Sequence, residues 1–166
     1  MYLLDTPIIA ELRKARTGDT DPGLILWASR VARPSLFISA LSLLEIEGGI
    51  AQVAKRDKPA GDTLRTWLDN HVMAAFDGRI LPVDAAVAKR RGQLTLSDSR
   101  DALMAATAQV HGLTLVTRNV SAFKSSRVKL FNPWGYHPDD PAEDATDWRE
   151  STKTGPLWFK NLFLRF

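Results

Sequence analysis

Short apolar segments alternate with longer amphipathic segments along most of the chain. The short segments show no polar alternation, which is typical of strands buried on both faces of a parallel sheet. They lie at residues 2–4, 35–39, 78–83, 113–117 and 127–133. The longer segments carry apolar residues at helical spacing and predict helices over residues 7–12, 24–31, 41–55, 63–76, 84–94 and 97–112. This alternation predicts an α/β protein, a three-layer α/β/α sandwich around a central parallel sheet.

The ends of several segments carry local signals. We expect Thr6 to cap the first helix and Pro7 to be its first residue, because the missing N–H of proline costs nothing there. The stretch DKPAGD, residues 57–62, is expected to break the chain between two helices. We expect Leu44, Ile46 and Ile50 to lie on or near the packed side of the helix before this break.

The length of 166 residues is enough for one domain with a substantial core. We assign this domain to residues 1–136. From residue 137 the chain becomes acidic and proline-bearing (HPDDPAEDATDWREST), which is typical of a linker or a disordered segment. The aromatic stretch that follows, GPLWFKNLFLRF, is either an amphipathic helix that docks on the domain or on a partner, or an unstructured extension.

The composition excludes several classes of protein. No apolar run reaches the ~18–20 residues needed to span a membrane, and Asp5 interrupts any signal-peptide core. The chain has no cysteine, which excludes disulfides, zinc–thiolate sites and thiol catalysis. Its 3 histidines are scattered and do not favour a histidine metal site. We therefore expect a cytoplasmic protein without membrane contact.

The net charge of +3 hides an asymmetry. Residues 1–137 hold 18 lysines and arginines against 13 aspartates and glutamates, whereas residues 138–166 hold 4 against 6. A basic body suits a polyanionic partner such as nucleic acid. Many basic proteins bind no nucleic acid, so the charge alone does not identify the partner.

Three acidic residues stand at comparable places in the predicted fold. Asp5 ends the first strand, Glu45 lies in the first turns of the helix after the second strand, and Asp101 lies in the first turns of a later helix. In a parallel sheet these places share one edge, where open α/β sheets hold their active sites. Clustered carboxylates repel unless a cation lies between them, and Mg²⁺ or Mn²⁺ suits such oxygen ligands. The alternative is three separate helix-start acids favoured by the helix dipole, with Asp5 only helping to cap its helix.

Other candidate motifs are weak or absent. Glu47 and Asp98 lie near the same edge and could support the site, although solvated surface charge is the simpler interpretation. The chain has no GxxxxGK(S/T) phosphate loop and no GxSxG nucleophile elbow. Phosphate-loop nucleotide chemistry and serine-hydrolase chemistry are therefore not supported.

Three stretches taken together carry a resemblance to a known family. They are LLDTPIIAEL at the start, SLFISALSLLEIEGGI in the middle, and DALMAATAQVHGLTLVTRNVSAF followed by FNPW. In order and spacing they resemble the PIN-domain ribonucleases, particularly the VapC/FitB-like toxins of bacterial toxin–antitoxin pairs. The resemblance covers residues 2–135, and its third stretch is the most specific.

The resemblance implies an α/β/α sandwich that cleaves RNA with Mg²⁺ or Mn²⁺. By motif, Asp5, Glu45 and Asp101 match the metal-binding acids of the family. Asn119 matches a polar residue near that site, and Thr117 belongs to the same motif. Family members commonly form homodimers, and a small antitoxin protein commonly masks their site.

The sequence departs from the family pattern at two positions. Pro7 stands where the family usually has asparagine or another small polar residue, and Ala122 stands where an acid usually precedes the phenylalanine of TRNxxxF. A fourth acidic ligand is therefore missing or supplied elsewhere, with Asp98 as the candidate replacement. Three acids are enough to hold one metal ion, whereas a second ion becomes doubtful.

These observations lead to three hypotheses. The first is a metal-dependent endoribonuclease toxin that cleaves single-stranded or loop RNA, with Arg13, Lys14 and Arg118 holding the backbone and an antitoxin as inhibitor. The second is a catalytically weakened module that binds RNA or the antitoxin. The third is a DNA-directed nuclease that uses the same chemistry.

Overall fold

A parallel five-stranded sheet forms the centre of the computed structural model, which describes residues 1–16 and 18–137. Its strands are β1 (Tyr2–Leu4), β2 (Leu36–Ser39), β3 (Ile80–Leu81), β4 (Thr114–Val116) and β5 (Leu130–Phe131). They lie in the order β3–β2–β1–β4–β5, and every neighbouring pair is parallel. The predicted α/β class with a central parallel sheet is confirmed.

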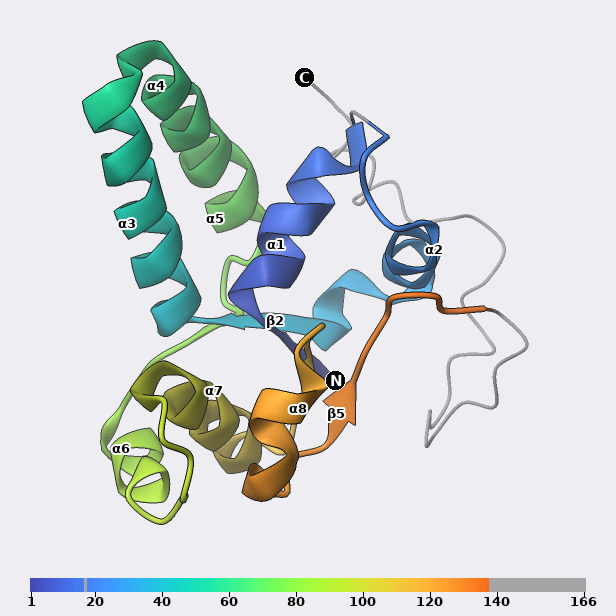
Figure 1. The fold of residues 1–166 in the computed structure, drawn as a ribbon, viewed down its shortest axis with the longest axis vertical. Coiled ribbons are helices and arrows are strands. Elements are labelled where there is room, and N and C mark those ends of the chain that lie inside the picture. Colours follow the sequence, from blue (N-terminus) through green and yellow to red (C-terminus); the bar gives the residue numbers. More distant parts are fainter. Residues whose placement is uncertain (17, 138–166) are drawn as a thin grey trace.

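Helices cover both faces of this sheet (Figure 1). On one face lie α1 (Thr6–Arg13), α2 (Pro22–Arg30), α3 (Ala40–Arg56), α4 (Lys58–Trp67) and α5 (Met73–Ala75). On the other lie α6 (Ala85–Arg91), α7 (Ser99–Val110) and α8 (Val120–Phe123). A π-helical turn joins α4 to α5 at Leu68–Val72, and 3-10 turns stand at Lys14–Arg16, Arg33–Ser35 and Lys124–Ser126.

The absence of polar alternation in the strands follows from this sandwich. In β1, Leu3 packs in the core beneath α7 and α8, whereas Leu4 packs in the core beneath α1 to α4. In β4, Leu115 packs in the core beneath α7 and α8, and Val116 packs in the core beneath α1 to α4. Successive side chains of a strand point to opposite faces, so a strand with a core on each side has no polar face.

The pairing register of β1 with β4 places the carboxyl ends of these two strands side by side. Leu4 of β1 pairs with Val116 of β4, and the N–H of Asp5 donates to the carbonyl of Val116 over 3.0 Å. The residues that follow the two strands, Asp5 and Thr117, therefore stand side by side at the carboxyl edge.

The cap of α1 differs from the prediction. Asp5, not Thr6, is the N-cap, and its Oδ1 accepts a hydrogen bond from the N–H of Thr6 over 2.9 Å. Thr6 is the first helical residue, and its hydroxyl donates to Glu45. The backbone of Asp5 is extended (φ −67°, ψ 149°), as a cap residue requires, whereas Thr6 already lies in the helix.

The predicted break between two helices is present but is only one residue long, because α3 ends at Arg56 and α4 begins at Lys58. The carboxylate of Asp57 caps the helix through the N–H of Ala60 over 3.0 Å, and Pro59 stands in the first turn, where proline is tolerated. A Cβ on Gly61 would lie 2.5 Å from the Cβ of Ala54 in α3. The proline therefore starts a helix, and the glycine lets that helix approach α3.

The packed side of α3 also differs from the prediction. Ile46 and Ile50 are buried, but Leu44 is 67% exposed. Residues 46 and 50 lie one turn apart on the same side of a helix, whereas 44 and 46 lie more than half a turn apart. Leu44 therefore could not face the core together with Ile46.

The last described segment packs on α2. A Cβ on Gly23 would lie 2.4 Å from the main-chain nitrogen of Tyr136, and the N–H of Gly135 donates to Asp21 over 3.2 Å. The predicted linker and aromatic tail, from residue 138 onward, lie outside the described residues, so the boundary at 136 stays a prediction. None of the described helices is both long and apolar enough to cross a bilayer.

Candidate functional site

The site begins with a buried carboxylate at the end of β1. Asp5 is 3% exposed, and the fully buried Thr117 donates from its hydroxyl to Asp5 Oδ2 over 2.8 Å. The same hydroxyl accepts the N–H of Asn119 over 3.1 Å. Because the threonine oxygen both donates and accepts, Thr117 holds Asp5 in one orientation.

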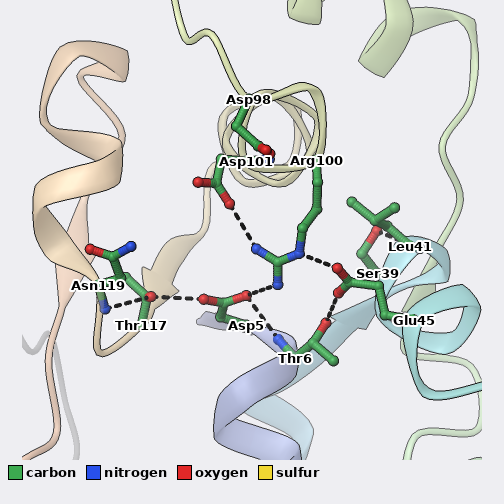
Figure 2. A network of polar contacts seen from close by, with 10 residues as sticks. All are labelled: Asp5, Thr6, Ser39, Leu41, Glu45, Asp98, Arg100, Asp101, Thr117 and Asn119. Atoms are coloured by element: carbon green, nitrogen blue, oxygen red, sulfur yellow. Dashed lines mark hydrogen bonds and ion pairs between the residues drawn. The ribbon is translucent and has the colours of Figure 1, made fainter. Parts of the chain in front are cut away.

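A second carboxylate reaches this edge from α3. The helix starts directly after β2, where Ser39 Oγ accepts the N–H of Leu41 over 3.1 Å. Its early turns therefore lie beside the carboxyl end of the sheet, and they carry Glu45 toward α1. There Glu45 accepts the hydrogen bond from the hydroxyl of Thr6 (Figure 2).

A third carboxylate comes from the first turn of α7. Asp98 caps this helix, and its Oδ1 accepts the N–H of Asp101 over 2.8 Å. Asp98 therefore acts as a helix cap that sets the position of Asp101. The candidate role of Asp98 as a replacement fourth ligand stays a prediction.

Between the three carboxylates lies the guanidinium of Arg100 (Figure 2). Its Nη2 is 2.7 Å from Asp5 Oδ1, and its Nη1 is 2.7 Å from Asp101 Oδ1. Its Nε pairs with Glu45 Oε1. One arginine thus joins acids from three separate elements, each through a different nitrogen.

The electrostatics of this cluster are dominated by the acids. Burial of the guanidinium by itself lowers the pKa of Arg100, but hydrogen bonds and charge from Glu45 and Asp5 outweigh it, and the pKa of Arg100 is raised. Three carboxylates face one guanidinium, so two negative charges are not matched within this group. The side chains are 4% exposed for Asp5, 18% for Asp101 and 27% for Glu45.

The donor chemistry fits a hard divalent cation. Three carboxylates and a threonine hydroxyl are oxygen donors of the kind that Mg²⁺ and Mn²⁺ prefer. In the arrangement observed, though, the described residues contain no group of three or more histidine, cysteine, aspartate or glutamate side chains that could hold an ion. The three acids converge, but on the chain's own guanidinium, so a metal would have to take the oxygens that Arg100 holds.

The predicted residues around the acids divide into two groups. Asn119 lies beside Thr117, and its Oδ1 accepts a hydrogen bond from the hydroxyl of Ser121 over 2.9 Å. Arg118 is exposed at the same edge, with its guanidinium carbon 5.3 Å from the ring centroid of Trp134. Ala122 packs against the core beneath α7, so its methyl group takes part in packing at the position where the family usually has an acid.

Arg13 and Lys14, two basic residues expected around the cleft, lie at the C-terminal end of α1. The guanidinium of Arg13 lies 5.8 Å from the ring centroid of Trp67, and Lys14 pairs with Glu11 over 3.1 Å. Both follow the whole length of α1, which carries them about 10 Å from its start at a rise of about 1.5 Å per residue. Their expected contact with the RNA backbone stays a prediction.

Glu47 is a surface acid, as the simpler interpretation held. It pairs with Arg65 Nη1 over 2.6 Å, and this hydrogen bond holds the pKa of Glu47 below its usual value. Both side chains are more than two-fifths exposed. The pair joins α3 to α4 outside the acid cluster.

Sequence reasoning missed Arg100, although one signal pointed to it. A cation in the first turn of a helix is unfavourable next to the positive end of the helix dipole. Arg100 occupies that place in α7, in a side chain only 30% exposed. Such a local conflict is expected at functional sites, where other contacts compensate for it.

Comparison with known proteins places this geometry in a family. The family model described as PIN domain matches residues 2–125. The chain is a member of the PIN-domain family. VapC ribonuclease Y4jK of Sinorhizobium fredii is 31% identical over 147 residues, which cover 81% of this chain and 98% of that protein. Toxin FitB of Neisseria gonorrhoeae is 30% identical over 142 residues, which cover 81% of this chain and 99% of the toxin.

Solved structures agree with this assignment of the PIN-domain chain. A crystal structure of FitAcB from Neisseria gonorrhoeae superposes with a TM-score of 0.73 at 30% identity, over 81% of this chain and 99% of the other. A toxin–antitoxin complex from Klebsiella pneumoniae superposes with a TM-score of 0.57 at 25% identity, over 81% of this chain and 98% of the other.

Proposed function

We propose that this PIN-domain protein is a divalent-metal-dependent endoribonuclease toxin, restrained by an antitoxin protein. The names of two relatives, a VapC ribonuclease and the toxin FitB, support the activity class. The observation that carries the proposal is the meeting of Asp5, Glu45 and Asp101, from three elements, around a single cation. Carboxylates are gathered in this way when they have to bind positive charge.

In this proposal Asp5, Glu45 and Asp101 hold Mg²⁺ or Mn²⁺. An ion bound there would supply the positive charge that polarises a phosphodiester and activates water for in-line attack. Thr117 keeps Asp5 oriented through its 2.8 Å hydrogen bond. Thr6 does the same for Glu45. Both acids are thus presented in fixed orientations, which removes the cost of ordering them during the reaction.

RNA is the proposed substrate, and Arg118 with Trp134 is the proposed contact for it. The exposed guanidinium of Arg118 follows directly after Thr117, so it stands next to the acids. It can neutralise a backbone phosphate, and its plane over Trp134 offers a surface for an unpaired base. Single-stranded or loop RNA fits this arrangement, because its bases and phosphates are both reachable.

The proposed partners follow from the same comparisons. One structural neighbour is a toxin–antitoxin complex, and we extend this kind of partner to the present chain. A homodimer and a cytoplasmic location belong to the same proposal. A catalytically weakened binding module is the second candidate, because Ala122 packs against the core and Arg100 already matches part of the acidic charge.

The proposal is tested by cleavage of a mixed-sequence single-stranded RNA with purified, antitoxin-free protein. We expect cleavage with Mn²⁺, none with EDTA, and a loss of at least about 100-fold for Asp101→Asn, since removal of one catalytic group typically costs that much. Asp62→Asn is the matched control, because Asp62 pairs with Lys58 on the exposed side of α4. Its activity should equal that of the wild type.

The possible results separate the candidates. If folded Asp101→Asn cleaves at the wild-type rate, the site assignment is wrong. If wild-type protein cleaves nothing with any divalent metal but still binds RNA or an antitoxin, the binding module is favoured. Faster cleavage of single-stranded DNA of the same sequence would indicate a DNA-directed nuclease.

A further inference from the structure

Arg100 and a metal ion would need the same oxygen atoms. The guanidinium contacts Asp5 Oδ1, Asp101 Oδ1 and Glu45 Oε1, one oxygen from each proposed ligand. A divalent ion bound by these acids would stand where the guanidinium now stands, and the two cations would repel each other. The acids therefore bind either Arg100 or the metal, but not both in these positions.

The position of Arg100 in its helix does not by itself favour a cation. The residue lies in the first turn of α7, where the helix dipole repels positive charge, and its side chain is about two-thirds buried. Its three ion pairs are what hold it in place. Because nearly a third of the side chain is still exposed, the guanidinium can leave toward solvent once a stronger cation takes the carboxylates.

We propose that Arg100 is an intramolecular competitor of the metal, which occupies the acid cluster when no ion is bound and is displaced when an ion binds. The inference rests on the proposed function, since it concerns the same three acids. The guanidinium lowers the repulsion among the carboxylates in the metal-free domain. It also lowers the apparent metal affinity, which equals the intrinsic affinity multiplied by the fraction of molecules in which the guanidinium does not occupy the site.

The size of the effect depends on the fraction of metal-free molecules in which Arg100 leaves the acids free. Coupling between linked binding events is typically about 5- to 150-fold in affinity. Replacement of Arg100 by a neutral side chain should therefore tighten metal binding by a factor in this range. The metal-free protein should lose stability at the same time, because three carboxylates are then left without their shared cation.

The test measures Mn²⁺ binding by isothermal titration calorimetry, without any RNA or activity readout. The variants are Arg100→Gln, which keeps a polar side chain but no charge, and Arg65→Gln, the matched control. Arg65 also forms a short ion pair, 2.6 Å to Glu47, but on the exposed surface of α3 and α4. We expect Arg100→Gln to bind Mn²⁺ about 5- to 150-fold more tightly than wild type, and Arg65→Gln to bind as wild type does.

Two further variants make the result decisive. Addition of Asp101→Asn to Arg100→Gln should abolish the tighter binding, which locates the ion at the acid cluster. If Arg100→Gln does not fold without metal, as judged by circular dichroism, Arg100→Lys replaces it. The single ammonium nitrogen of lysine cannot reproduce three contacts that three different guanidinium nitrogens make to separate elements, so Arg100→Lys should also bind Mn²⁺ more tightly than wild type.

Failure of the inference differs from failure of the proposed function. If wild type binds Mn²⁺ at a site that depends on Asp101, and the Arg100 variant binds equally or more weakly, competition is refuted while the metal site stands. If neither wild type nor any Arg100 variant binds Mn²⁺ in a manner that depends on Asp101, the metal site of the proposed function is itself wrong.

Discussion

Thr117→Val removes one hydroxyl from beneath the acid cluster and leaves the shape of the side chain nearly unchanged. Thr117 is fully buried and donates over 2.8 Å to Oδ2 of Asp5, which is itself 3% exposed. Without the hydroxyl, this buried carboxylate oxygen loses its donor. The N–H of Asn119 loses an acceptor as well, but Asn119 is exposed and water replaces that contact.

The expected cost follows from the charge of the acceptor. A hydrogen bond to a charged group contributes about 1.5–3 kcal/mol to stability, against about 0.5–1.5 kcal/mol for a neutral one. Thr107 in α7 is the matched control, because it is also fully buried and also donates over 2.8 Å, but to the main-chain carbonyl of Leu103. That carbonyl keeps its main-chain helical hydrogen bond in Thr107→Val.

The assay is urea unfolding of wild type, Thr117→Val and Thr107→Val in EDTA, followed by circular dichroism. Both variants bury the same extra methyl group, so that gain cancels in the comparison. We expect Thr117→Val to be less stable than Thr107→Val by about 1–2 kcal/mol. Equal stabilities of the two variants would refute the argument that Thr117 is needed to satisfy a buried carboxylate.

Two further predictions concern packing and substrate contact. Gly61→Ala should lower the free energy of unfolding by about 1–3 kcal/mol, because the new Cβ would meet Ala54. Gly49→Ala in α3 is the control, because nothing lies within 4 Å of its new Cβ. This substitution should raise the free energy of unfolding by up to about 1 kcal/mol. Urea unfolding measures both, and destabilisation by both would contradict the packing argument. Arg118→Ala should weaken binding of single-stranded RNA to Asp101→Asn protein by about 1–3 kcal/mol, measured by fluorescence anisotropy. Unchanged affinity would remove Arg118 from the proposed RNA contact.

Much of the fold could be predicted because its signals are local. Apolar runs without alternation identify buried strands, and β1, β2 and β4 lie at or within the predicted segments. The predicted elements differ from the structure where one local sequence signal is compatible with both a loop and a helix. Pro59 and Gly61 are typical of a loop, yet at the start of a helix packed on α3 they are compatible with helix. The four residues of α8 are too few to show a period.

The candidate site could be predicted in part for a topological reason. Parallel strands end at one edge, so Asp5 and residues placed early in α3 and α7 had to approach each other. Their meeting is observed, while their catalytic roles stay a proposal. The cap of α1 could not be chosen in the same way, because Asp5 and Thr6 are both favourable cap residues and only the folded backbone shows that Asp5 is extended while Thr6 is helical.

The sequence by itself determined the order of strands and helices, the parallel sheet, and the edge at which three acids gather. These properties depend on the period of apolar side chains and on the connections between elements. Only the tertiary structure decided what lies between the acids. Arg100 and Asp5 are 95 residues apart, and their contact exists only when α7 packs across the end of β1. An ion pair of this kind depends on distances of a few ångströms between separate elements, which no local pattern in the chain records.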